Sequence, residues 1–163
     1  MPKKILVVDD DPDVRLFNAS VVEDLGYLLV EASNGEEGQL LVAQEVPDLI
    51  ILDVMMPLQS GIRLYRQLKT DSSFADIPVI ILSGISKRSF MKSQEALAAF
   101  GGGDVPAPEA YLEKPAEAET IAAGTEFKQE PGTIRLANLA DKDPLFEICF
   151  THPRVLAAIA HVL

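Results

Sequence analysis

The sequence predicts a doubly wound α/β fold, in which helices cover both faces of a parallel β-sheet. Short apolar runs rich in β-branched residues alternate along the chain with amphipathic stretches of helical length, and this alternation is typical of right-handed βαβ units. Two of the apolar runs end abruptly in aspartate, as expected for buried strands that reach the edge of a sheet. With 163 residues, of which 48% are hydrophobic, the chain fits one domain with one core.

The first strand and helix are predicted at the N-terminus. Residues 5–8 form a buried strand that stops at three consecutive aspartates. Asp11 and Pro12 then have the residue types of a helix N-cap and of a first helical position. Apolar side chains recur at helical spacing as far as Leu25, and Gly26 ends the helix.

The next elements continue the alternation. Residues 27–32 form a second strand, and Asn34-Gly35 is a turn that leads into a helix over residues 36–45. The apolar run at 48–53 repeats the pattern of the first strand, with its own aspartate at the carboxyl end, and a helix follows over residues 60–70. The first half of the chain therefore predicts three pairs of a strand and a helix.

Two more strands are predicted in the second half of the chain. Residues 78–83 form the fourth strand, and residues 86–100 form a helical stretch that stops at the three glycines of 101–103. Residues 110–113 form the fifth strand, directly before Lys114-Pro115.

Polar side chains stand where the predicted strands end. Because parallel strands place their carboxyl ends at one edge of the sheet, we expect these side chains to surround one pocket. Three carboxylates there would repel one another by several kcal/mol at an effective dielectric of about 20, so the pocket requires a cation. Oxygen ligands of this kind suit Mg²⁺. The residues expected in the pocket are Asp9, Asp10, Asp53, Ser83 and Lys114.

Five motifs, in order along the chain, resemble those of the response-regulator receiver domains. They are ILVVDDD at 5–11, EASNGEEG at 31–38, LIILDVMMPLQSG at 49–61, PVIILSG at 78–84 and YLEKP at 111–115. Together they are highly specific, although each alone would be weak. The resemblance implies a single receiver domain over residues 1–163, with a flavodoxin-like sheet of five parallel strands in the order 2-1-3-4-5.

The resemblance also implies that Asp53 is a phosphoacceptor. In this family the aspartate attacks a phosphoryl group donated by a phosphohistidine and becomes an aspartyl phosphate. Asp10, Asp53 and the backbone carbonyl of Met55 would bind Mg²⁺, for which Mn²⁺ can substitute, and Asp9 would act beside the ion or through a water molecule. The protein would then be a signalling module that assists its own phosphorylation and dephosphorylation, and not an enzyme.

Five further residues take roles by the same resemblance. Ser83 would hydrogen-bond a phosphoryl oxygen, and Lys114 would pair with the charge of the phosphate. Gly84 would leave room for the incoming group, and Pro115 stands where the family has a cis peptide bond. Tyr111 matches the switch aromatic that turns inward when Ser83 moves toward the phosphate. The alternative for Tyr111 is half-buried packing without a switching role.

Two stretches depart from the family pattern. The interval from Ser83 to Lys114 is longer than usual, with the excess around GGGDVPAPE. The helix-five pattern appears only in HPRVLAAIAHVL at 152–163, so residues 116–150 are predicted to be an insertion between the fifth strand and the last helix. The alternative is that helix five starts at Ala116 and that the rest is a C-terminal extension.

Composition excludes several classes of function. The chain has 14 Lys and Arg against 25 Asp and Glu, and its formal charge of −11 disfavours nucleic acid as a direct partner. The single cysteine, Cys149, cannot form an internal disulfide bond. No apolar run approaches the roughly 18 residues of a membrane span, and the N-terminal run is too short for a signal peptide. These features predict a cytoplasmic protein with no membrane partner.

The predicted function is that of a receiver in a two-component phosphorelay. The donor would be a sensor histidine kinase or a phosphotransfer protein. Phosphorylation would switch the face formed by the fourth helix, the fifth strand and the fifth helix, which would control a downstream target protein. The same face, with the insertion, is also a candidate surface for a homodimer.

Three alternatives remain open at this point. A phosphatase of the haloacid-dehalogenase class is disfavoured, because that class has an acid two positions after its nucleophile, where this chain has Met55. The second alternative is an interaction scaffold that never uses phosphate. The third is that the chain is the receiver portion of a longer response regulator.

Overall fold

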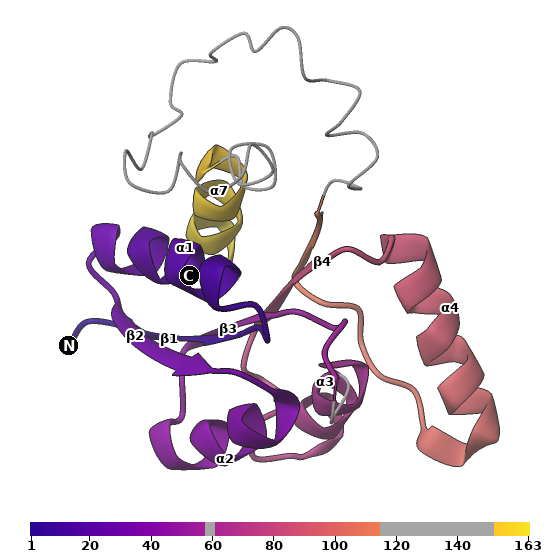
Figure 1. The fold of residues 1–163 in the computed structure, drawn as a ribbon. Helices are drawn as coiled ribbons and strands as arrows, with labels where there is room; N and C mark the ends of the chain where they lie inside the picture. The colour runs from indigo at the N-terminus through magenta and orange to yellow at the C-terminus, as the bar shows by residue number, and fades with distance from the viewer. Residues whose placement is uncertain (58–60, 115–151) are drawn as a thin grey trace, which may run out of the picture.

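A computed structural model of the chain describes residues 1–57, 61–114 and 152–163, the last range with side chains from residue 157 onward. The elements are, in chain order, β1 Lys4–Val8, α1 Pro12–Asp24, β2 Leu28–Ala32, α2 Gly35–Glu45, β3 Leu49–Leu52, α3 Gly61–Thr70, β4 Val79–Ser83, α4 Lys87–Leu97, a π-helical turn Ala98–Gly102, β5 Ala110–Glu113 and α7 His152–Val162. The strands form one parallel sheet in the order β2-β1-β3-β4-β5 (Figure 1). The predicted fold class and strand order are confirmed.

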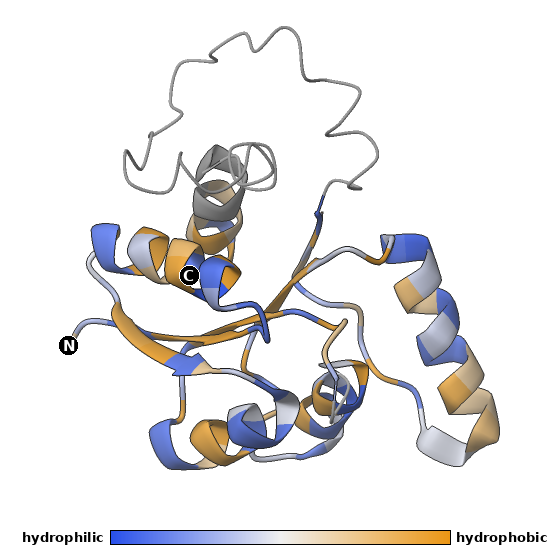
Figure 2. Cartoon of the chain, in the orientation of Figure 1, coloured by the Kyte–Doolittle hydropathy of each residue, from blue (hydrophilic) through white to orange (hydrophobic). Residues whose placement is uncertain are grey.

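The sheet separates two hydrophobic cores, because consecutive residues of a strand point to opposite faces. On one face, Ile5 and Val7 of β1 pack with α1 and with Ile159 of α7. On the other face, Leu6 and Val8 pack with residues of α2, α3 and α4. Figure 2 shows the apolar residues concentrated on the central strands and on the helix surfaces that cover them. Burial on both faces explains why these strands are continuous apolar runs in the sequence.

Side-chain caps set the starts of the first two helices. The Asp11 carboxylate accepts hydrogen bonds from the backbone N–H groups of Asp13 at 2.8 Å and Val14 at 3.3 Å, so Asp11 is the N-cap of α1 as predicted. Asn34 caps α2 in the same way, through the backbone N–H of Glu37 at 2.9 Å. The predicted turn at Asn34-Gly35 therefore contains the first residue of α2.

The helix predicted over residues 86–100 is shorter in the structure. Regular α4 geometry ends at Leu97, and the chain continues through a π-helical turn in which Phe100, with φ −88° and ψ 19°, already leaves helical dihedral angles. Three glycines follow Phe100 and offer no side chain that could pack the last turn against the sheet. Phe100 itself is 90% exposed. The apolar spacing in the sequence extends to residue 100. The Phe100 side chain, however, does not pack against the rest of the protein, so it does not support regular α-helix there.

The predicted C-terminal helix is present as α7. Ala158 and Ile159 are buried in the core that contains α1, and Leu112 of β5 packs against the same cluster. This is the face of the sheet opposite α2 and α3 (Figure 1). The predicted insertion at 116–150 and the predicted cis bond before Pro115 lie outside the described residues, so both stay predictions.

Three side chains of α3 hold the loop that joins α4 to β5. The Tyr65 hydroxyl donates one hydrogen bond at 2.6 Å, the Arg66 guanidinium donates two at 2.6 and 2.7 Å, and the buried Lys69 ammonium forms an ion pair at 3.2 Å. Their loop partners are the carbonyls of Pro106, Gly102 and Gly103 and the carboxylate of Glu109. The lengthened interval before β5 is therefore anchored to α3.

We expect Arg66→Ala to loosen this loop. Loss of a charged donor to two loop carbonyls, and to the side-chain oxygen of buried Gln94 on α4 at 3.0 Å, should lower the free energy of unfolding by about 1–2 kcal/mol. Amide hydrogen exchange should become faster in residues 101–109 and stay unchanged in β1. Arg63→Ala is the matched control, because Arg63 is exposed on the same helix. Equal exchange rates in the two variants would contradict an anchoring role for Arg66.

Candidate functional site

The side chains predicted to share a pocket lie at the carboxyl edge of the sheet. Asp9 follows β1 and Asp53 follows β3, and the backbone N–H of Asp53 donates to the carbonyl of Val8 at 2.9 Å. Ser83 is the last residue of β4, and its carbonyl accepts a 2.8 Å hydrogen bond from the backbone N–H of Lys114. Hydrogen bonds between neighbouring strands therefore fix these residues beside one another.

The Asp53 carboxylate is at the centre of the site and is almost fully buried. Its Oδ1 accepts hydrogen bonds from the Ser83 hydroxyl at 2.7 Å and from the backbone N–H of Met55 at 2.8 Å. Its Oδ2 lies 2.8 Å from the Lys114 ammonium, and the same ammonium lies 3.0 Å from Oδ2 of Asp9. One lysine thus bridges two buried carboxylates, and Asp53 has donors on both oxygens.

Three carboxylates of the site could hold a metal ion. Asp9, Asp10 and Asp53 each offer one oxygen, and these oxygens all lie within 4.8 Å of one another. Asp9 and Asp53 are buried, whereas Asp10 is exposed and leaves one side of the cluster open to solvent. Oxygen donors on an open site suit Mg²⁺, which retains several of its waters when bound. The donor set therefore fits the predicted ion.

The site has unusual electrostatics because its charges are buried. Burial, and secondarily the neighbouring charge of Asp53, raise the pKa of Asp9 to about 6, although Lys114 acts in the opposite direction. Burial acts to lower the pKa of Lys114, but the charges of Asp9 and Asp53 and their hydrogen bonds outweigh it and raise that pKa. Lys114 is therefore an ammonium group at neutral pH. Of its two carboxylate partners, Asp9 is the one whose ionisation is unfavourable in the folded protein.

Tyr111 connects the end of β5 to the loop that follows β4. It is half-buried, its hydroxyl donates to the carbonyl of Ile85 at 2.8 Å, and its ring lies 5.5 Å from that of Phe90 on α4. Burial, followed by the charges of Glu113 and Asp53, raises the pKa of Tyr111 to about 12, so the hydroxyl stays a donor. Tyr111 packs as the alternative interpretation requires, and its switching role stays a prediction.

The roles predicted for two neighbouring groups also stay predictions. A Cβ placed on Gly84 would lie 3.7 Å from the Met55 sulfur, which is an ordinary van der Waals distance, so no close approach explains this glycine here. Met55 contributes its backbone N–H to Asp53, and its side chain is 57% exposed. Binding of a metal ion by the Met55 carbonyl stays a prediction.

Three residues that the sequence analysis did not single out contact the site or its neighbouring loops. Gly61 packs beneath the backbone of Asp53, Arg15 binds the carbonyls of Asp9 and Asp10, and Glu113 accepts a 2.8 Å hydrogen bond from the backbone N–H of Lys87 at the start of α4. Gly61 is the last residue of the LIILDVMMPLQSG motif, so its sequence spacing from Asp53 could have marked it as part of the site. Glu113 lies inside the YLEKP motif but was given no role there, and Arg15 lies outside all five motifs.

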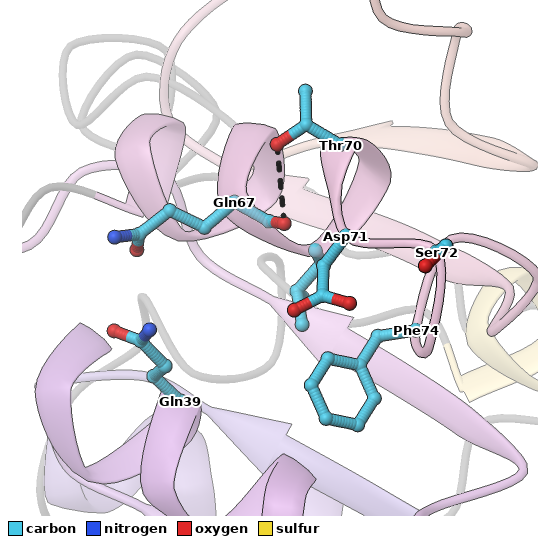
Figure 3. A pocket seen from close by; sticks show the side chains of 7 residues that line it. Gln39, Gln67, Thr70, Asp71, Ser72 and Phe74 are labelled. Carbon is cyan, nitrogen blue, oxygen red and sulfur yellow. Dashed lines mark hydrogen bonds between the residues drawn. The ribbon is translucent and has the colours of Figure 1, made fainter.

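A separate pocket of about 510 Å³ lies between α2 and the C-terminal end of α3. Gln39 and Gln67 line opposite sides of it, and Asp71 and Phe74 lie beside it (Figure 3). Because α3 runs against the direction of the strands, its C-terminal end is at the opposite edge of the sheet from Asp53. None of the predicted site residues lines this pocket.

Comparisons with known proteins point to one protein family. A family model described as the response regulator receiver domain matches residues 5–124. Protein PilH of Pseudomonas aeruginosa is 34% identical over 118 residues, which are 72% of this chain and 90% of PilH. The DNA-binding dual master transcriptional regulator RpaA of Synechocystis is 35% identical over 123 residues, which are 76% of this chain but only 47% of RpaA. The chain therefore spans less than half of some of its curated relatives.

Solved structures show the same fold. The chemotaxis protein CheY4 of Vibrio cholerae has a TM-score of 0.58 at 24% identity, covering 76% of this chain and 95% of CheY4. The N-terminal domain of a response regulator receiver protein from Methanoculleus marisnigri has a TM-score of 0.54 at 29% identity, covering 77% of this chain and 98% of that domain. Among residues 1–57, 61–114 and 152–163, no helix combines the length and apolar character that crossing a bilayer requires.

Proposed function

The chain belongs to the response regulator receiver domain family, and on that premise we propose that it accepts a phosphoryl group on Asp53 in a two-component phosphorelay. The observation that supports this most is the Asp53 carboxylate itself, buried beside Asp9 and bonded to both Ser83 and Lys114. The donor would be a sensor histidine kinase or a phosphotransfer protein. In the transfer, a P–O bond forms at Asp53 as the P–N bond to the donor histidine breaks.

The donors around Asp53 suit the charge that the transfer creates. A carboxylate oxygen of Asp53 becomes part of the acyl phosphate, so the Ser83 hydroxyl and the Lys114 ammonium, now at 2.7 and 2.8 Å from that carboxylate, would turn to phosphoryl oxygens. Asp9 and Asp10, together with Asp53 and the Met55 carbonyl, would hold Mg²⁺. The bound ion would neutralise the carboxylates and phosphoryl oxygens.

The signal would leave the site through the loop after β4. Movement of Ser83 toward the phosphoryl group would pull on Ile85, whose carbonyl accepts the Tyr111 hydroxyl. We propose that this changes the surface of α4, β5 and α7, which a target protein or a second copy of the chain would recognise. Phosphorylation can shift the equilibrium between the inactive and the active conformation of this surface only by the difference in the contacts that the phosphoryl group makes in the two conformations.

We also propose that residues 116–150 are an insertion that joins β5 to the last helix. The support is the position of α7, which packs on α1 and beside Leu112. An insertion next to the output face would select the partner of that face. Identical binding of a target after deletion of residues 116–150, in a protein that remains folded, would contradict a role in partner selection.

The phosphoacceptor proposal is tested by intact mass after incubation with acetyl phosphate and Mg²⁺. The wild-type protein should gain one phosphoryl group, and Asp53→Asn should gain none. Phosphoramidate and a set of purified sensor histidine kinases that have been phosphorylated with ATP serve as further donors, because small-molecule donors do not serve every receiver. No gain with any of these donors, or an equal gain in Asp53→Asn, would contradict the proposal.

A further inference from the structure

Arg15 binds the loop that carries two of the three acidic residues. It lies on α1 just after the Asp11 N-cap, and its Nη1 donates to the carbonyl of Asp9 at 2.8 Å and to that of Asp10 at 3.2 Å. Its side chain is only 21% exposed, and its Nε lies 4.0 Å from a carboxylate oxygen of Glu31 on β2. One guanidinium nitrogen thus joins two consecutive carbonyls of the loop between β1 and α1.

This contact restrains the orientation of Asp10. When the carbonyls of residues 9 and 10 both point at one donor, the peptide plane between them is fixed, and so is the direction of the Asp10 Cα–Cβ bond. Asp9 has further anchors, because its carboxylate binds Lys114 and the backbone N–H of Asp11. Asp10 is the exposed member of the acidic cluster, so its position depends more on the backbone.

The charge of Arg15 and its hydrogen bonds have opposite effects on a bound cation. As a positive charge on the loop that carries Asp9 and Asp10, the guanidinium repels a cation, so its removal should tighten cation binding. As a donor that orders the loop, it reduces the conformational entropy that the acidic residues lose when they bind an ion, so its removal should weaken binding. The sign of the change therefore separates the two effects.

We propose that Arg15 is a positioning residue for the cation site, which holds the Asp9-Asp10 peptide so that the Asp10 carboxylate lies with those of Asp9 and Asp53. This inference rests on the proposed function, because the ion is the one that phosphoryl transfer to Asp53 would use. This role requires no contact of Arg15 with the ion or with the phosphoryl group. It acts through the backbone of the two acids, as outer-shell residues do at other metal sites.

The test is a Mg²⁺ titration of the unphosphorylated protein by calorimetry, with the wild type, Arg15→Ala, Arg15→Lys and Arg63→Ala. Arg15→Ala should raise the dissociation constant about 10- to 100-fold, the usual effect of losing an outer-shell partner. Arg15→Lys keeps the charge and loses the guanidinium group, so it should also bind more weakly than the wild type. Arg63→Ala removes an exposed charge on α3 and should bind Mg²⁺ as tightly as the wild type, or slightly more tightly.

A second readout separates positioning from general destabilisation. With acetyl phosphate, Arg15→Ala should need more Mg²⁺ for half-maximal phosphorylation of Asp53 and should reach the wild-type plateau at saturating Mg²⁺. A lower plateau with unchanged half-saturation would show a structural role only and overturn the proposal. Circular dichroism in EDTA confirms folding, and if Arg15→Ala is unfolded, Arg15→Lys decides the question by the same criteria.

The outcomes distinguish this inference from the proposed function. Unchanged or tighter Mg²⁺ binding in the folded Arg15 variants overturns the positioning role and leaves Asp53 phosphorylation untouched. A wild-type protein that binds no Mg²⁺ overturns both the cation site and the role of Arg15. Weaker binding in both Arg15 variants, with wild-type behaviour in Arg63→Ala, supports the inference.

Discussion

Replacement of Asp9 by Asn should stabilise the metal-free protein at pH 7 by on the order of 2–3 kcal/mol. The pKa of this carboxyl is raised from 3.8 to about 6 in the folded state, mainly because it is buried. An acid with a raised pKa is more costly to ionise in the folded chain than in the unfolded chain. The ionised form present at pH 7 therefore lowers stability, and Asn removes that charge while keeping nearly the same shape.

The gain should depend on pH in a defined window. Below about pH 3.8 Asp9 is protonated in both states, so the wild type and the Asn variant should have similar free energies of unfolding. Between about pH 3.8 and 6 the folded wild type binds a proton that the unfolded chain has lost, so its stability falls relative to the variant as pH rises. Above about pH 6 the difference should be constant.

Urea denaturation in EDTA between pH 4 and 8 measures this difference. Asp104→Asn is the control, because Asp104 is exposed on the loop before β5 and its replacement removes one carboxylate outside the site. In excess Mg²⁺ the advantage of Asp9→Asn should shrink or reverse, because the ion binds and stabilises the folded wild type. A variant that is less stable than the wild type at pH 7 in EDTA would contradict the cost assigned to ionised Asp9.

The same pKa predicts how cation binding depends on acidity. Below about pH 6 a proton competes with the cation for Asp9, so Mg²⁺ affinity should fall by up to about tenfold per pH unit. A proton on Asp9 thus stabilises the folded site at low pH, and a bound cation does so at higher pH. At neutral pH the metal-free protein carries the cost of ionised, buried Asp9 beside the charge of Asp53, and Lys114 offsets that cost only in part.

The fold could be predicted from the sequence because its strongest signals are repeated. The central strands are buried on both faces, so each is a short apolar run that stands out from the helices around it. The site followed from the same signal, since Asp9, Asp53, Ser83 and Lys114 come at or just after strand ends, and parallel strands end at one edge. Neither inference required knowledge of any side-chain contact.

The contacts that tune the site could not be predicted in this way. Arg15 and Glu113 act through backbone groups of loops, whose paths depend on tertiary packing and not on periodicity. The change from α-helical to π-helical geometry after Leu97 was not predicted either, because apolar spacing as far as Phe100 did not reveal that this side chain is exposed. Lys69, with its ammonium buried under the loop before β5, is also unmarked in the sequence.

Gly61→Ala should have the largest destabilising effect among single methyl additions at the site. A Cβ on Gly61 would overlap the carbonyl oxygen of Asp53 and would lie 2.6 Å from the Cα of Val54. Both obstacles are backbone atoms of the loop after β3, so the strain cannot be relieved by a side-chain rotation. We expect a loss of about 3 kcal/mol or more in the free energy of unfolding, as is typical of steric overlap in a packed core.

Gly26→Ala provides the matched control. Gly26 has a φ of +77° and no atom within 4 Å of an added Cβ, so alanine there should cost only about 1 kcal/mol of backbone strain. Because the overlap at Gly61 acts on the Asp53 backbone, Gly61→Ala should also slow phosphorylation by acetyl phosphate, whereas Gly26→Ala should not. Denaturant midpoints and the rate of mass gain measure the two effects. Equal stability losses in the two variants would mean that α3 can move away from the loop after β3. The close contact between Gly61 and the Asp53 backbone would then not fix the position of Asp53.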